Sequence, residues 1–182
     1  MPEDTRVSAM ETVDREQILR LIAESDAALV GAVAGVSDED ARRRPEPGRW
    51  SVLECVEHVI LGDDAMFARV SAHSTPDAPP GERLEELILR GMTNRERKFA
   101  APELARPTGR FSSLPEAIEV FRQRRARSVA YVEQYQEDPR NRTTQHPGLG
   151  PISCQEMFLA LALHPARHAL QIREVRKSLG LE

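Results

Sequence analysis

Three segments of this chain carry the same helix-start signal, and this signal constrains the fold more than any other feature. Each reads Ser-x-x-Glu, follows a stretch rich in proline or glycine and precedes an apolar periodic run; they are residues 51–54, 113–116 and 153–156. In such a capping box the serine oxygen accepts a hydrogen bond from the backbone N–H three residues on, while the glutamate accepts one from the serine N–H. The chain therefore predicts at least three helices with defined starts.

Apolar residues recur every three or four positions over most of the chain, which is the period of an α-helix. The predicted helices span residues 13–35, 51–72, 82–99, 114–136 and 153–179, of which 82–99 is the short one. No segment alternates between apolar and polar residues beside hairpin turns, so we expect essentially no sheet. The economical architecture is an all-α fold, an antiparallel four-helix bundle with one extra short helix, in which residues 1–182 form a single domain.

Composition excludes several classes of protein. The formal net charge of −4 gives no global support to a nucleic-acid-binding surface. No run approaches the roughly 18–20 apolar residues of a membrane span, and the acidic start of the chain does not resemble a secretory signal. Cys55 and Cys154 are too few for a disulfide scaffold or a four-cysteine zinc site. We predict a cytoplasmic protein whose partners include neither nucleic acid nor membrane.

A run of arginines at residues 122–127 needs its own explanation. It could bind an anionic thiol cofactor or a nucleic acid. On a helix, however, its members spread over more than one face, and Glu116, Glu119 and Glu133 flank it. A solvated face with salt bridges is the favoured interpretation.

Three histidines are the candidates for chemistry. His164 and His168 are four residues apart on the last predicted helix, so their imidazoles share one face, and Leu161 and Ile172 continue that face inward. His58 lies on the second predicted helix. Side chains from neighbouring helices build the metal sites of bundles, and a three-histidine shell would leave a position for water or substrate. The alternative is that these are core histidines bonded to backbone carbonyls or water.

Four other residues near these histidines have two interpretations each. Glu54 could accept an N–H from a ligand imidazole, although its place in the capping box is favoured; Gln171 could orient a ligand or simply form a hydrogen bond at the rim. Trp50 could line the mouth of the pocket or pack as a hydrophobic staple on Cys55. Cys55, one turn from His58, could ligate a metal, although a small buried apolar role is favoured.

Pro165 lies between the two histidines of the last predicted helix. A proline inside a helix lacks the N–H that would bond four residues back, here to the carbonyl of Leu161. The helix is therefore expected either to kink at this point or to end and restart. The remaining histidines, His73 and His146, fall in loop or helix-end positions and are expected to be solvated.

Two stretches of the chain resemble a known family. The residues RWSVLECVEH at 49–58 are similar to the Trp-Ser…His pattern that opens the second helix of the DinB-like superfamily, and residues 146–172, with HPARH and the following Gln171, are similar to its closing helix. The resemblance implies a four-helix bundle in which His58, His164 and His168 hold a divalent metal. That superfamily includes mycothiol-dependent maleylpyruvate isomerases, bacillithiol transferases and proteins proposed to be metal-dependent hydrolases.

These observations favour a metal-dependent enzyme that transfers a thiol to, or hydrolyses, a small electrophilic substrate. Zinc or nickel is the expected metal, with iron or manganese also suited to imidazole ligands, and a low-molecular-weight thiol is a candidate cofactor. The alternatives are a bundle that binds metal or ligand without turnover, and a structural module whose histidines belong to the core. The architecture also allows a homodimer.

Overall fold

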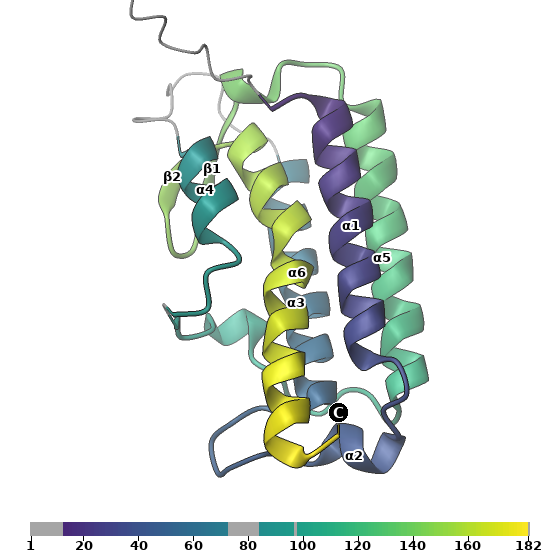
Figure 1. The fold of residues 1–182 in the computed structure, drawn as a ribbon. Helices are drawn as coiled ribbons and strands as arrows, with labels where there is room; N and C mark the ends of the chain where they lie inside the picture. The colour runs from purple at the N-terminus through teal and green to yellow at the C-terminus, as the bar shows by residue number, and fades with distance from the viewer. Residues whose placement is uncertain (1–12, 73–83, 97, 182) are drawn as a thin grey trace, which may run out of the picture.

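Four long helices form the body of the molecule in the computed structural model, which describes residues 13–72, 84–96 and 98–181 (Figure 1). The elements in chain order are α1 (Arg15–Val33), α2 (Asp38–Arg42), α3 (Val52–Ser71), α4 (Glu85–Gly91), η1 (Glu103–Ala105), α5 (Leu114–Gln134), η2 (Pro139–Asn141), β1 (Thr143–His146), β2 (Gly150–Ser153) and α6 (Cys154–Leu179). The long helices α1, α3, α5 and α6 make the predicted four-helix bundle.

The predicted capping signals lie where these helices begin. Ser51 and Ser153 each form a complete capping box, at the starts of α3 and α6. Ser113 accepts from the N–H of Glu116 at the start of α5, but the Glu116 carboxylate binds Ser112 instead of completing the box. Local sequence thus determines where three of the four long helices begin.

Each long helix has two neighbours in the bundle: α6 packs between α1 and α3, and α5 packs between the same two on the other side. Side-chain bonds give their directions. Arg176 near the end of α6 reaches the carbonyl of Ala32 near the end of α1, so this pair is parallel. Tyr131 of α5 reaches the carbonyl of Val70 of α3, so this pair is parallel too. The pairs α3–α6 and α1–α5 are antiparallel (Figure 1).

The parallel pairs follow from the connections. The segment between α3 and α5 contains α4 and η1, and it brings the chain back to the end of the bundle from which α3 set out (Figure 1). This return segment lies against α3 and α6, with η1 on α3 and α4 on α6. The bundle core is apolar, and Leu29, Phe121 and Ile172 are among its fully buried side chains.

Three details differ from the prediction. The expected short helix over 82–99 is limited to α4, and the described part of the chain has a further short helix, α2. The expectation of essentially no sheet is wrong, because β1 and β2 form an antiparallel hairpin that pairs Thr144 with Ile152. Each strand has only four residues, too few to show alternation, and Ser153 both ends β2 and caps α6.

Membrane spans were predicted to be absent. Within residues 13–72, 84–96 and 98–181, no helix combines the length and the apolar character needed to cross a bilayer.

Candidate metal centre

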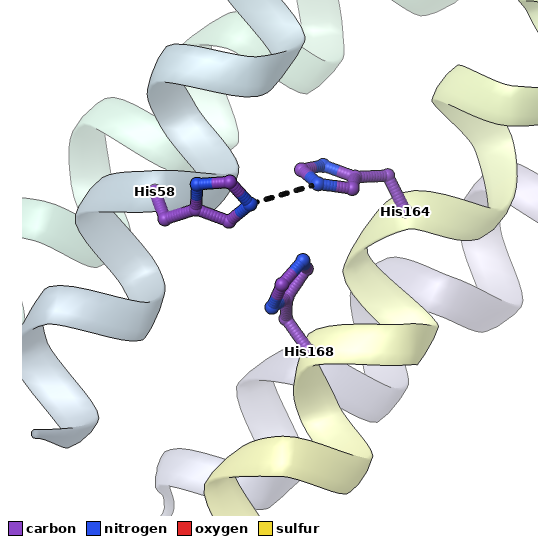
Figure 2. Close-up of side chains that lie close together, drawn as sticks. All are labelled: His58, His164 and His168. Carbon is purple, nitrogen blue, oxygen red and sulfur yellow. Dashed lines mark hydrogen bonds between the residues drawn. The ribbon is translucent and has the colours of Figure 1, made fainter. Parts of the chain in front are cut away.

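The three histidines singled out from the sequence come together between α3 and α6 (Figure 2). His58 projects from α3, and His164 and His168 project from α6 toward it. All three are buried, and each offers a ring nitrogen within 4.8 Å of those of the other two. The Nε2 atoms of His58 and His164 are 3.3 Å apart. Their convergence is observed, and their assignment as metal ligands stays a prediction.

Helix geometry produces this arrangement. The four-residue spacing places His164 and His168 one turn apart on the same face of α6. Because α3 runs antiparallel to α6, His58 faces this pair from the opposite side, and its ring centroid lies 4.5 Å from that of His168 and 5.1 Å from that of His164.

Two of the imidazoles have fixed acceptors for their other nitrogen. His58 Nδ1 donates to the backbone oxygen of Ala105, the last residue of η1, at 2.6 Å. His168 Nδ1 lies 2.9 Å from Gln171 Oε1. Arg95 also donates to this oxygen, and because a guanidinium can only donate, Oε1 is the acceptor in both bonds. Both rings therefore carry their proton on Nδ1 and turn the Nε2 lone pair toward the cluster.

The third imidazole differs. His164 Nδ1 is buried and has no hydrogen-bond partner. Its ring packs beside His168, with the centroids 4.6 Å apart. Its Nε2 is hydrogen-bonded to His58 Nε2 within the cluster, so no bond from outside the cluster orients this ring, and packing holds it in place.

The histidines are neutral near pH 7. Burial lowers the pKa of His58, and the bond to Ala105 opposes this shift. Burial together with the neighbouring histidines holds the pKa values of His164 and His168 well below their ordinary range. A neutral imidazole is the form that binds a metal, so the enclosed environment keeps all three available as ligands.

Pro165 lies inside a continuous helix, since α6 runs from Cys154 to Leu179 without a break. The interpretation that the helix ends and restarts there is wrong. The carbonyl of Leu161, which Pro165 leaves without its usual donor, accepts instead from Arg125 Nη1 at 2.9 Å.

Arg125 also corrects the prediction for the arginine run. Arg124 and Arg127 form the expected surface pairs with Asp64. Arg125 instead is 2% exposed and reaches Asp63 at 3.0 Å and Asp26 at 2.6 Å. Arg125, Asp26 and Asp63 are referred to below as the ion cluster.

The structure also shows the surroundings of Glu54 and Trp50, the two candidates next to the start of α3. Glu54 accepts from Ser51 N–H and pairs with Arg44, so its capping role is confirmed. The centre of the Trp50 ring lies 4.8 Å from that of His58, and Trp50 also packs against the apolar cluster that includes Cys55.

Cys55 and His146, one of the two histidines predicted in loops, lie outside the histidine cluster. Cys55 is fully buried, and desolvation raises the pKa of its thiol to about 12, which agrees with a small core residue rather than a ligand. His146 is half-buried at the end of β1 instead of fully solvated, and its Nδ1 accepts from Gly148 and Leu149. His73 lies outside the described residues.

The buried carboxylate of Glu57, which the sequence interpretation missed, supports the site indirectly. Glu57, next to His58, accepts bonds from the backbone N–H groups of Thr108, Gly109 and Arg110. These residues follow η1, whose last residue, Ala105, orients His58. Glu57 therefore fixes the segment that supplies this acceptor, and no local pattern connects residues 50 positions apart.

The donor set fits a divalent metal. Zinc–nitrogen bonds of about 2.0–2.1 Å at a tetrahedral angle place two ligand nitrogens roughly 3.4 Å apart, and His58 and His164 are 3.3 Å apart at Nε2. Three neutral imidazoles suit zinc, nickel, iron or manganese. A separate cavity of about 210 Å³ lies nearer the start of α6, lined by Ile18, Val132 and Phe158 among others, and none of the three histidines borders it.

A bundle in which two antiparallel helices bring three buried histidines together is a four-helix-bundle protein with a candidate metal site. The model of the DinB superfamily matches residues 21–172. This chain therefore belongs to the DinB superfamily.

Individual proteins agree with this assignment. The uncharacterized protein YuaE of Bacillus subtilis is 24% identical over 148 residues, which cover 80% of this chain and 88% of YuaE. YfiT from Bacillus subtilis, described as a probable metal-dependent hydrolase with an unusual four-helix bundle topology, superposes with a TM-score of 0.60 at 15% identity, covering 94% of this chain and 93% of that one. The four-helix bundle protein TT2238 gives 0.58 at 21% identity, covering 88% and 99%. These structures show the shared fold.

Proposed function

We propose that His58, His164 and His168 bind one divalent metal ion and that the protein is a metal-dependent hydrolase of a small molecule. The convergence of three neutral imidazoles, two of them with Nδ1 already bonded, carries this proposal. The description of YfiT as a probable metal-dependent hydrolase supports it. Zinc or nickel is the metal we expect.

The chain's own residues prepare the site for this ion. Ala105 and Gln171 hold the Nδ1 protons of His58 and His168, which keeps their Nε2 lone pairs directed at a common point. Burial keeps the three rings uncharged. The Trp50 indole and the surrounding helices keep the histidines largely out of bulk water. A bound divalent ion supplies a Lewis acid that lowers the pKa of a ligand water or thiol.

Thiol transfer is the second candidate, and the composition of the cluster favours it. In the described residues, the group placed to share an ion consists of three histidines and contains no carboxylate or thiol of the chain. Hydrolysis benefits from a nearby proton acceptor, whereas a metal-bound thiol ionises readily near neutral pH. A low-molecular-weight thiol would then be the co-substrate.

The first test is elemental analysis of the purified, untagged protein beside the triple variant His58→Ala/His164→Ala/His168→Ala and the control His146→Ala. About one metal per chain in the wild type and the control, lost in the triple variant, supports the site. No metal after incubation with zinc, nickel, iron and manganese contradicts it. Turnover of small esters, amides and electrophiles by the loaded protein, measured with and without an added thiol, then separates hydrolysis from thiol transfer.

A further inference from the structure

The hydrogen bonds of the site do not explain what orients the His164 ring. Its Nδ1 is buried without a partner, whereas His58 and His168 are oriented by Ala105 and Gln171. A ligand ring without an orienting bond can rotate away from the metal unless packing prevents it. The residue that supplies this packing should lie against the ring, on the helix opposite α6.

Gly62 of α3 occupies that place. A Cβ atom built on Gly62 would lie 2.5 Å from His164 Cε1, 3.1 Å from Nδ1 and 3.4 Å from Nε2. The shortest of these distances is far inside van der Waals contact, so the ring lies where any other side chain would begin. The backbone does not require glycine at this position, because Gly62 lies inside α3 and is not among the glycines with positive φ.

A glycine inside a helix is unfavourable by about 0.5–1 kcal/mol relative to alanine. Gly31 of α1 is a useful contrast, because a Cβ there would meet nothing within 4 Å. At Gly62 the missing side chain has a definite use, which is the space for the imidazole. The rings of His58 and His168 lie 5.1 Å and 4.6 Å from that of His164 and limit how far it could move instead.

We propose that Gly62 is a positioning residue of the metal site: its lack of a side chain forms the seat that holds the His164 ring with Nε2 facing His58. This inference rests on the proposed function, in which His164 is a ligand. Two ligands are thus aimed by hydrogen bonds and the third by its packing against Gly62.

The test is Gly62→Ala, with Gly31→Ala as the matched control. Gly31→Ala adds the same methyl group to an exposed helix position, and we expect it to raise the melting temperature by about 2–4 °C. We expect Gly62→Ala to lower the melting temperature of the metal-free protein and to weaken zinc affinity about 10–100-fold, the range for residues that orient ligands. The visible spectrum of the cobalt-loaded protein should change in Gly62→Ala and match the wild type in Gly31→Ala.

A second comparison isolates the ring. In a His164→Ala background the seat is empty, so Gly62→Ala should raise the melting temperature there, as Gly31→Ala does in the wild type. A loss of stability as large as in the wild-type background would overturn the inference, because the added methyl group would then clash with something other than His164. This cycle remains decisive even where Gly62→Ala alone folds poorly.

The inference and the proposed function fail in different ways. A wild-type protein that binds no metal contradicts the proposed function, while the melting temperatures still show whether Gly62 seats His164. A Gly62→Ala protein with wild-type zinc affinity and an unchanged cobalt spectrum, beside a wild type that binds metal, overturns the positioning role alone.

Discussion

The middle of the bundle holds two buried polar clusters that differ in how their bonding capacity is used. In the ion cluster, Arg125 donates to Asp26, Asp63 and the carbonyl of Leu161. In the histidine cluster, the Nε2 atoms of His58 and His164 face each other. In the ion cluster one cation faces two carboxylates, and only Asp63 Oδ1 of the two aspartates is buried without a hydrogen-bond partner, whereas the histidine cluster directs the Nε2 lone pairs of His58 and His168 at one point and supplies no cation. Burial of polar groups alone therefore does not mark a ligand site; the direction of their free lone pairs does.

The largest expected loss of stability comes from a substitution of Arg125 in the ion cluster. Arg125→Met leaves the fully buried carboxylate of Asp63 and the partly buried one of Asp26 without their cation, and breaking a buried pair in this way costs about 3–5 kcal/mol. Arg124→Met, which removes a surface pair with Asp64, should cost less than about 1 kcal/mol. Urea denaturation at pH 7.5 measures both changes, and similar losses in the two variants would contradict the distinction.

The pH dependence of stability gives a second test of the role of Arg125. Burial raises the pKa of Asp63 and raises that of Asp26 to about 6, so the folded state binds protons more readily than the unfolded state. A carboxyl with a raised folded pKa contributes stability as the pH falls through that value. Arg125 lowers both pKa values, so its removal raises them further and the variant gains more stability than the wild type as the pH falls. The deficit of Arg125→Met should therefore shrink between pH 7.5 and pH 5, and a constant deficit would mean that it arises from lost packing.

Single substitutions in the histidine cluster should act on metal affinity rather than on the fold. His58→Ala, His164→Ala and His168→Ala each remove one of the three proposed ligands, so zinc affinity should fall by more than about 100-fold, the upper end for residues that only orient ligands. His146→Ala should leave the affinity unchanged. Competition with a chromophoric chelator measures these constants. A variant that keeps its affinity identifies a residue outside the coordination sphere.

The two clusters also differ in how far the sequence predicts them. Helical spacing and two capping boxes placed His58, His164 and His168 on the inward faces of α3 and α6, where the structure has them. The ion cluster was missed because an arginine run suggests solvent. A signal was nevertheless present, since Arg125 lies at helical spacing from Phe121 and Ser128, both buried.

Other parts of the site could not be predicted in the same way. The acceptor for His58 is a backbone carbonyl, which every residue possesses, so nothing in the sequence distinguishes Ala105. The return segment that carries it is fixed by Glu57 across 52 residues. The hairpin of β1 and β2 was missed because four-residue strands show no clear alternation. Long-range contacts, not local propensity, determine these features.

Gln171 tests whether an orienting bond matters once the three ligands are present. Gln171→Ala removes the acceptor of His168 Nδ1 and a partner of Arg95, so zinc affinity should fall about 10–100-fold while about one metal per chain still binds at saturation. Gln123→Ala, at an exposed position of α5, is the control. Unchanged affinity in Gln171→Ala would reduce this residue to a hydrogen bond at the rim.

The metal-free histidine cluster should also make stability depend on pH, with a sign opposite to that of the ion cluster. The folded pKa values of the three histidines are lowered, so their contribution is complete above the unfolded value of about 6.5 and is lost as the pH falls below it. Each histidine that stays neutral below its unfolded pKa lowers the free energy of unfolding as the pH falls.

His164→Ala isolates this contribution, because the variant keeps the ion cluster. Between pH 7.5 and pH 5.5 the metal-free wild type should lose more stability than His164→Ala, by an amount on the order of 1 kcal/mol. Urea denaturation at the two pH values gives the difference. Equal losses in both proteins would show that His164 takes up its proton in the folded state as easily as in the unfolded chain.

The smallest expected effect concerns a second buried atom without a partner. Ser128 Oγ, like His164 Nδ1, is buried and makes no hydrogen bond, and it lies one turn after Arg125 on α5. Ser128→Ala removes an unsatisfied hydroxyl and replaces serine with a better helix former, so it should stabilise the protein by about 0.5–1 kcal/mol and leave metal binding unchanged. Thermal denaturation with and without zinc measures both changes.

If Ser128→Ala instead destabilises the bundle, the Ser128 hydroxyl has a hydrogen-bond partner in solution. The lack of a partner for Nδ1 in the structure would then no longer distinguish His164 from other buried residues. If Ser128→Ala stabilises the bundle while His164→Ala abolishes metal binding, the two unpartnered atoms differ in function. The serine hydroxyl then only destabilises the packed core, whereas the unpartnered Nδ1 of His164 belongs to a ring whose Nε2 binds the metal.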